Sequence, residues 1–152
     1  MADPTTPPQI FSGDYRHAVD EKKRVTVPAA WRRFSESEEF FTVPDPHGNF
    51  LMVMPPEEFR GTSDRVKADV SFSPAMKRAF IRQFYSRAKL TTTDRQGRIL
   101  LPDDHLGQAG LSGEVVLVGV HSRFEIWNPE TWARISAEES VDYQKVADLV
   151  GL

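Results

Sequence analysis

The chain carries one short motif twice. The segment DEKKRVTVP at 20–28 recurs in outline as DRQGRILLP at 94–102. At an offset of 74 residues the two copies align Asp20 with Asp94, Arg24 with Arg98, Phe50 with Phe124 and Pro55 with Pro129. Two copies are too few for an open solenoid, which needs about three repeats to bury a continuous core. We therefore expect two half-domains packed about a pseudo-twofold axis.

Length and composition fit one compact domain. The chain has 152 residues, of which 39% are hydrophobic, and this is enough for a real core. It contains no cysteine, which excludes disulfide frameworks, thiol nucleophiles and cysteine-rich zinc sites. It also lacks a long apolar run and begins with MADPTTPPQ, which does not resemble a secretory signal. We expect a soluble, cytoplasmic protein with no membrane segment.

Charge is segregated along the chain. The net charge is −3, but residues 14–33 hold six Lys or Arg against three acids, and residues 65–101 hold nine against two. Acids predominate in 34–64 and 129–152. Because the distribution of charge decides whether a surface attracts polyanions, the two basic stretches, which include both motifs, favour contact with nucleic acid.

Short strands bounded by turn residues dominate the pattern. We expect hairpins over 17–27, with the Lys22-Lys23 pair at its turn, over 40–55 around D-P-H-G-N, and over 114–127. Pro28 permits a helical turn after it, and a short helix starts at PPEEF. The fold class is therefore mixed, with mostly short strands and a few helices.

Two longer helices are expected outside the repeats. Ser73 is a suitable N-cap with Pro74 at the first helical position, and an apolar stripe follows. At the C-terminus, Val141, Val146 and Leu149 fall on one side of a helix. The expected organisation is a disordered tail (1–9), a first repeat (10–72), a linking helix (73–87), a second repeat (88–136) and a C-terminal helix (137–152).

The motif itself suggests a chemistry. An aspartate that starts a tight turn can accept hydrogen bonds from backbone amides and pair with an arginine that leaves the turn. The loops braced in this way by Asp20 and Asp94 would present cations to phosphates or base edges. The candidate DNA-binding residues are Lys22, Lys23, Arg24, Arg95 and Arg98. Alternatively, each pair is only a surface ion pair worth at most about 1 kcal/mol, since duplication preserves structural residues as well as functional ones.

A metal-dependent or hydrolytic enzyme is the competing class. It would have to use Asp20 and Asp94 with some of the four histidines, which are His17, His47, His105 and His121. The sequence has no H-x-H, H-E-x-x-H, G-x-S-x-G or glycine-rich phosphate loop. We therefore expect no catalysis, no cofactor, no metal and no small-molecule substrate. The large aromatic residues Trp31, Trp127, Trp132, Phe50 and Phe124 are expected to lie in the core or at subunit contacts, most of them in the core.

Three segments together resemble the MraZ family of bacterial transcriptional regulators. They are FSGDYRHAVDEKKRVTVPAAWR, AKLTTTDRQGRILLP and GLSGEVVLVGVHSRFEIWNPETW, and they span about residues 11–135. The resemblance implies an α+β, mainly β fold in which two pseudo-twofold related, AbrB-like swapped-hairpin half-domains form a small double-split barrel, with short helices and a C-terminal helix. It also implies a homo-oligomeric ring that binds double-stranded DNA at direct repeats in the promoter of the division and cell-wall gene cluster, which would place the protein at the nucleoid.

By this resemblance the family motifs fall on Asp20 with Arg24 and on Asp94 with Arg98, and the arginines are the expected DNA contacts. Many relatives have glycine before the motif arginine in both copies, whereas here only Gly97 is present and the first copy has Lys23. A repressor is the expected function. The alternative is an antitoxin-like interaction module that binds a partner protein and regulates itself through DNA, and the acidic stretch at 137–152 would then serve that partner.

Overall fold

The computed structural model describes residues 9–33 and 37–152. The strands are β1 (Asp14–Ala18), β2 (Arg24–Thr26), β3 (Glu39–Pro44), β4 (Phe50–Met54), β5 (Lys89–Thr92), β6 (Arg98–Leu100), β7 (Glu114–Gly119) and β8 (Phe124–Trp127). The helices are η1 (Ala29–Trp31, a 3-10 turn), α1 (Pro56–Ala68), α2 (Pro74–Ser86), α3 (Asp103–Ala109) and α4 (Pro129–Leu149). The tail expected at 1–9 lies outside the described residues, except for Gln9. In the described ranges, no helix combines the length and apolarity needed to cross a membrane.

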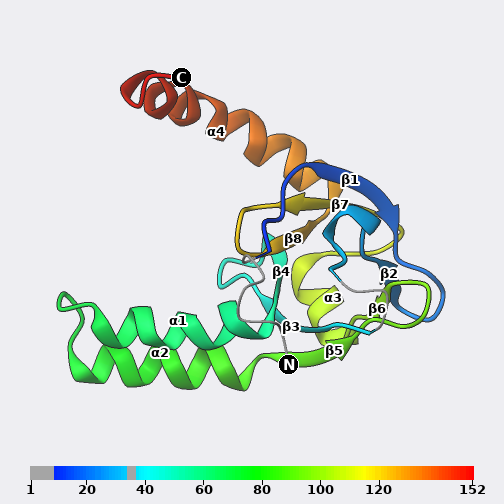
Figure 1. The fold of residues 1–152 in the computed structure, drawn as a ribbon, viewed down its shortest axis with the longest axis horizontal. Helices are drawn as coiled ribbons and strands as arrows, with labels where there is room; N and C mark the ends of the chain where they lie inside the picture. Colours follow the sequence, from blue (N-terminus) through cyan, green and yellow to red (C-terminus); the bar gives the residue numbers. More distant parts are fainter. Residues whose placement is uncertain (1–8, 34–36) are drawn as a thin grey trace.

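The strands of the two sequence copies are interleaved. Six strands form one sheet in the order β1-β7-β8-β4-β3-β5, and β2 pairs with β6 in a separate two-stranded ribbon (Figure 1). All of these pairs are antiparallel. Exchanging the copies maps β1 onto β5, β7 onto β3 and β8 onto β4, so the sheet order reads the same in both directions. This arrangement confirms the expected α+β fold of two interleaved half-domains about a pseudo-twofold axis.

The hairpin expected over 17–27 does not form, because its two strands do not pair with each other. The chain does turn at the Lys22-Lys23 pair, but β1 then pairs with β7 and β2 pairs with β6, so both strands find partners in the other copy. A two-stranded hairpin alone is marginally stable, and the exchange lets the ribbon press one face onto the core. The other two expected hairpins, β3–β4 and β7–β8, are present, with His47 and His121 between their strands.

The offset of 74 residues holds at the motifs but changes along the hairpins. The core-facing residues Phe40 of β3 and Val115 of β7 are 75 positions apart, and Leu51 of β4 and Phe124 of β8 are 73 apart. The alignment of Phe50 with Phe124 is therefore wrong in three dimensions. Phe50 lies opposite Trp127 on one face of the sheet, whereas Phe124 points from the other face into the core. Alternation along a strand explains this result, because a shift of one residue moves a side chain to the opposite face.

The main core lies between the six-stranded sheet and the ribbon. Four aromatic rings fill its centre, with centroids 5.0 to 6.5 Å apart in the contacting pairs. They belong to Phe11, Trp31, Phe40 and Phe124. Val25 and Ile99 are the buried residues that the ribbon contributes to this core. Among the expected core aromatics, Trp31, Trp127 and Phe124 are buried, and Phe50 and Trp132 are half-buried.

Helices cover the second face of the sheet. Phe59 of α1 and Phe84 of α2 pack on residues of β3 and β4, while Trp132 and Ile135 of α4 pack on residues of β7 and β8. The equivalent helices α1 and α4 begin at Pro56 and Pro129, which are 73 positions apart, so the alignment of Pro55 with Pro129 is also wrong in three dimensions. The α1–α2 hairpin and α4 both extend away from the barrel (Figure 1).

Two helix bounds differ from the expected ones. The helix at PPEEF is not short, since α1 runs for 13 residues and pairs with α2. The C-terminal helix does not start at 137 but at Pro129, where the side chain of Asn128 accepts hydrogen bonds from the amides of Glu130 and Thr131. The linking helix matches its prediction, with the Ser73 hydroxyl accepting the Met76 amide.

Candidate nucleic-acid interface

The first motif forms a tight turn that one carboxylate holds in shape. Asp20 Oδ1 accepts hydrogen bonds from the amides of Lys22 at 2.9 Å and of Arg24 at 2.8 Å. Its other oxygen, Oδ2, accepts the Arg24 side-chain Nε–H at 2.9 Å. The Asp20 amide and the Arg24 carbonyl close the turn at 2.8 Å. The brace uses Nε, so it leaves the terminal nitrogens of the Arg24 guanidinium available as donors to a ligand.

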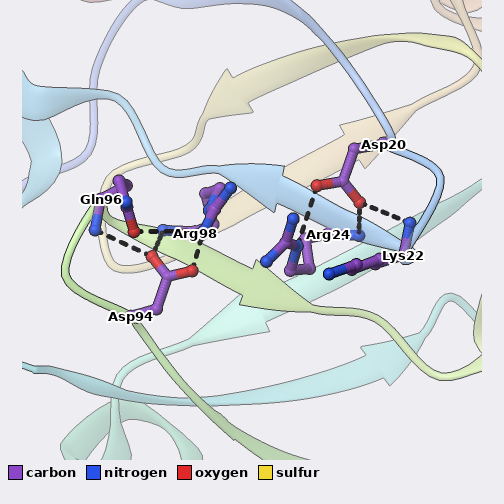
Figure 2. A network of polar contacts seen from close by, with 6 residues as sticks. All are labelled: Asp20, Lys22, Arg24, Asp94, Gln96 and Arg98. Atoms are coloured by element: carbon purple, nitrogen blue, oxygen red, sulfur yellow. Dashed lines mark hydrogen bonds and ion pairs between the residues drawn. The ribbon is translucent and has the colours of Figure 1, made fainter.

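The second motif repeats these bonds atom for atom. Asp94 Oδ1 accepts the amides of Gln96 and Arg98, each at 2.9 Å, and its Oδ2 accepts the Arg98 Nε–H at 2.8 Å. One difference is that Arg98 Nη2 also donates to the Gln96 side-chain oxygen at 3.1 Å. The two turns therefore share one bracing pattern, and Asp20 and Asp94 occupy the role expected of them from the sequence (Figure 2).

These bonds lower the pKa of both carboxyl groups. The backbone amide of Arg24 is the largest cause for Asp20, and that of Arg98 for Asp94, with further lowering from the arginine side chains and opposition from partial desolvation. Because the pKa is lower in the folded state, the ionised carboxylates stabilise the fold fully at pH values above their ordinary pKa of 3.8. This stabilisation is lost as the pH falls through the lowered pKa of the folded state. Both braces are thus intact at neutral pH.

Lys23 adopts the backbone conformation that glycine has in the second copy. Its φ is +64°, and that of Gly97 is +78°. The departure of this sequence from glycine at position 23 therefore does not change the shape of the turn. A side chain in this left-handed region costs roughly 1–2 kcal/mol relative to glycine. The lysine adds a cation at the turn and bears that strain.

Exchanging these two residues gives a matched pair of stability predictions. Lys23→Gly should raise the free energy of unfolding by about 0.5–1 kcal/mol, because relief of the strain exceeds the greater entropy of glycine in the unfolded chain. Gly97→Lys should lower the same quantity by about 1–2 kcal/mol, because the left-handed strain added there is only partly offset by the lower entropy of lysine in the unfolded chain. The new Cβ would also lie 2.4 Å from Arg32 Nη1, so the arginine side chain would have to move. Urea unfolding measures the free energy of unfolding of both variants. A change in the same direction for the two would contradict the assignment of strain.

The ribbon brings the two motif arginines onto one exposed face. Arg24 lies opposite Leu100 and Arg98 lies opposite Thr26, whereas Val25 and Ile99 between them are buried. Side chains of directly opposed residues share a face of an antiparallel pair, and the diagonal neighbours Arg24 and Arg98 are roughly 7–8 Å apart. Figure 2 shows both arginines toward the middle of the ribbon, with the aspartates outside them.

The cationic side chains of the ribbon and its turns are accessible enough to contact another molecule. The side chains of Arg24 and Arg98 retain 26% and 28% of their accessible area despite their ion pairs. Lys22, Lys23 and Arg95 at the tips are exposed. The sequence-predicted cations are thus brought together at one end of the molecule, which in Figure 1 is the end opposite the α1–α2 hairpin.

Sequence reasoning did not single out two further residues of this surface. Thr26 and Leu100 lie beside the arginines on the ribbon face, and Leu100 is 58% exposed although it is apolar. The alternation of the ribbon strands could have identified them, once β2 and β6 were known to pair. Arg32 was also missed. Its side chain lies across Gly97, which leaves room for it by having no Cβ.

One of the four histidines is buried and takes part in two hydrogen bonds. His105 is buried between the Thr42 hydroxyl, at 3.0 Å from its Nδ1, and the Arg87 carbonyl, at 2.9 Å from its Nε2. Over the part of the chain that the structure describes, no three His, Asp or Glu side chains are placed to hold a metal ion. The buried Glu125 has its pKa raised by burial, but it is bonded to Trp127 and Arg123.

Comparison with known proteins gives one family. A family model described as "MraZ protein, putative antitoxin-like" matches residues 84–149. Proteins named "Transcriptional regulator MraZ" match along most of the chain. That of Desulforamulus reducens is 38% identical over 140 residues, which cover 91% of this chain and 96% of the relative. That of Clostridium tetani is 33% identical, with 91% and 95% covered, and that of Thermomicrobium roseum is 35% identical, with 93% and 100% covered.

Proposed function

This chain belongs to the MraZ family, and from that premise we propose that it is a sequence-specific DNA-binding transcriptional regulator. The observation that carries the proposal is the pair of arginines on one exposed ribbon face, each held by an aspartate that also fixes its turn. The target is double-stranded DNA with direct repeats in the promoter of the division and cell-wall gene cluster, and the effect is repression. Such a protein acts in the cytoplasm at the nucleoid.

A two-stranded ribbon fits the duplex. The major groove of B-DNA is about 12 Å wide and admits a ribbon of this kind. Arg24 and Arg98 then reach base edges with their terminal nitrogens, and guanine is the base that arginine contacts bidentately. Leu100 meets the methyl group of a thymine. The exposed cations at the two tips contact phosphates and set the position of the ribbon on the duplex.

The pseudo-twofold ribbon is not symmetric in its side chains. Thr26 of the first copy corresponds to Leu100 of the second, and Lys22 corresponds to Gln96. One ribbon therefore presents different groups to the two halves of its site. This asymmetry suits direct repeats, in which every half-site has the same polarity, better than palindromes.

Self-association supplies the remaining affinity. One ribbon makes only a few contacts, so a single chain binds weakly and with little selectivity. Several chains in a ring that meet repeats at matching spacing convert weak contacts into tight binding through effective concentration. The overall charge of −3 is compatible with this mechanism because the cations are concentrated at the ribbon.

A footprint tests this proposal directly. On DNA from upstream of the gene for this protein, we expect regularly spaced protection over short direct repeats, lost when the repeats are scrambled and weakened steeply by salt. Uniform protection of repeat and scrambled DNA would contradict sequence specificity. A reporter fused to the same promoter separates the two directions of regulation, since deletion of the gene should raise its expression if the protein represses.

The description of the matching family model also contains the term antitoxin-like. An antitoxin-like module needs a C-terminal segment that a partner protein can capture. Here the acidic C-terminal stretch continues a helix that Trp132 and Ile135 hold on the barrel. We therefore favour the regulator, and co-purification of a single stoichiometric partner protein from its own cells would favour the alternative.

A further inference from the structure

Arg32 is a half-buried arginine whose side chain lies against the second motif turn. Its Cζ and Cδ atoms are 2.7 and 2.8 Å from the point where a Cβ on Gly97 would stand. The guanidinium therefore lies directly on the backbone of the turn, in the space that glycine leaves free. Gly97 also ties this turn to β2, because its carbonyl accepts the Val27 amide at 2.8 Å. Arg32 is thus held at the end of the ribbon where Arg98 begins β6.

No hydrogen bond or ion pair between the residues that the structure describes includes the Arg32 side chain. Its Nε is buried and has no acceptor there. The next residue differs, since Arg33 pairs with Glu57 at 3.8 Å, and both motif arginines have an aspartate partner. A buried donor without an acceptor costs free energy, and a guanidinium matches the oxygens of phosphate or carboxylate in two places. A fixed guanidinium without a carboxylate of its own therefore suits an anion from another molecule.

The first turn has a different residue at the equivalent position. The motif offset of 74 residues still holds here, because η1 begins at Ala29 and α3 begins 74 positions later at Asp103. At this offset Arg32 corresponds to Leu106, which belongs to the main core. The guanidinium that lies on the second turn is therefore replaced by a buried apolar side chain in the other copy. The two ends of the ribbon differ by one positive charge at this position.

We propose that Arg32 binds a phosphate of the DNA backbone beside the second turn. Phosphate is the anion of a duplex that guanidinium contacts with two parallel hydrogen bonds. Contacts of this kind position a protein on DNA and carry no sequence information. Because Leu106 takes the place of Arg32 in the other copy, the contact is made at one end of the ribbon. On direct repeats it falls on the same side of every repeat.

This inference rests on the proposed function and adds a residue to the same DNA-binding surface. Arg24 and Arg98 are assigned to base edges, whereas Arg32 is assigned to the backbone. The two kinds of contact can be separated, because a phosphate contact strengthens binding to any duplex and a base contact strengthens binding to one sequence.

Arg32→Met on the full chain tests the phosphate contact. The substitution removes the charge and keeps an unbranched side chain that can lie over Gly97. Fluorescence anisotropy should be measured on two labelled duplexes, the repeat DNA from upstream of the gene and a scrambled duplex of the same length. Near 0.1 M salt the affinity should fall about tenfold on both, with the salt slope shallower by about one. The midpoint of thermal unfolding should stay the same or rise, because a buried unpaired donor is removed.

Two further variants serve as controls. Arg33→Met makes the same change of charge one residue later, at a side chain that already pairs with Glu57. Its affinity should stay within about twofold and its salt slope should not change. Arg32→Lys keeps a positive charge but not the planar pair of donors. It should therefore keep the salt slope of the unchanged protein and recover only part of the affinity.

The position of the contact can be mapped by ethylating single phosphates in the repeat DNA. One ethylated position in each repeat should weaken binding of the unchanged protein and have no effect on Arg32→Met. These positions should lie on the same side of all repeats. An identical interference pattern for the two proteins would contradict the inference.

Other results would also overturn it. If Arg32→Met keeps the affinity and the salt slope, Arg32 does not contact DNA. If the variant loses thermal stability and affinity while the salt slope is unchanged, Arg32 only supports the turn. A loss confined to the repeat duplex would make Arg32 a base contact. Equal binding of the unchanged protein to both duplexes contradicts the proposed sequence specificity instead, and the phosphate contact then stands if Arg32→Met weakens binding to both.

Discussion

Replacing Arg24 and Arg98 together by alanine should weaken binding to the operator by about 10²- to 10⁴-fold. Each arginine that contacts a base bidentately contributes about 1–3 kcal/mol, and both side chains lie on the same ribbon face. The slope of log affinity against log salt should also become shallower, by about one for each phosphate contact that is lost. Fluorescence anisotropy with labelled operator at several salt concentrations measures both quantities.

The matched control for this prediction is Arg16→Ala. Arg16 is also in an ion pair, with Glu114 at 3.0 Å, but it is more exposed than the motif arginines and lies on β1 outside the ribbon. Its loss should leave operator affinity within about twofold, since exposed ion pairs contribute little. Equal affinity and equal salt slope for the unchanged protein and the double variant, with thermal unfolding unaltered, would show that the ribbon is not the DNA-binding surface.

Phe124→Ala should lower the free energy of unfolding by about 3–5 kcal/mol, the usual cost of removing a fully buried phenylalanine ring. Phe124 is 0% exposed and its ring contacts those of Phe11, Trp31 and Phe40. This loss is a large share of the roughly 5–15 kcal/mol that stabilises a typical domain. Urea unfolding followed by tryptophan fluorescence measures it, because Trp31 lies beside the cavity.

Phe50→Ala is the control that the repeat itself provides. At the 74-residue offset of the motifs Phe50 is the counterpart of Phe124, yet it is half-buried on the other face of the sheet and stacks on Trp127 at 4.6 Å. Because less of its surface leaves water on folding, its removal should cost about 1–2 kcal/mol. Equal losses for the two variants would contradict the register of β4 and β8.

Much of the candidate site could be predicted from the sequence because it is local. The Asp20 brace spans four residues, so the residue types and their spacing were enough to indicate a fixed turn with outward cations. Repetition of the same pattern at Asp94 made a chance ion pair a weaker explanation. Lys23 shows the limit of such reasoning, since the preference of this backbone for glycine did not exclude lysine there.

The pairing of the strands could not be predicted in the same way. Turn residues between Ala18 and Arg24 indicated a hairpin, but each flanking strand has a better apolar partner in the other copy. For the same reason the joint face of Arg24, Arg98 and Leu100 was not visible in the sequence. It exists only because β2 and β6, which are far apart along the chain, lie side by side.

By itself, the sequence determined that one module occurs twice, that each copy carries an aspartate-braced basic turn, and that the strands and most helices lie where they do. These properties depend on neighbours along the chain, whose geometry residue type largely controls. Tertiary structure alone decided that the copies interleave, that Phe50 and Phe124 face opposite ways, and that the two arginines share one surface. Side-chain burial across distant strands selects those features, and a shift of one residue, which a linear alignment hardly registers, reverses which face of the sheet a side chain occupies.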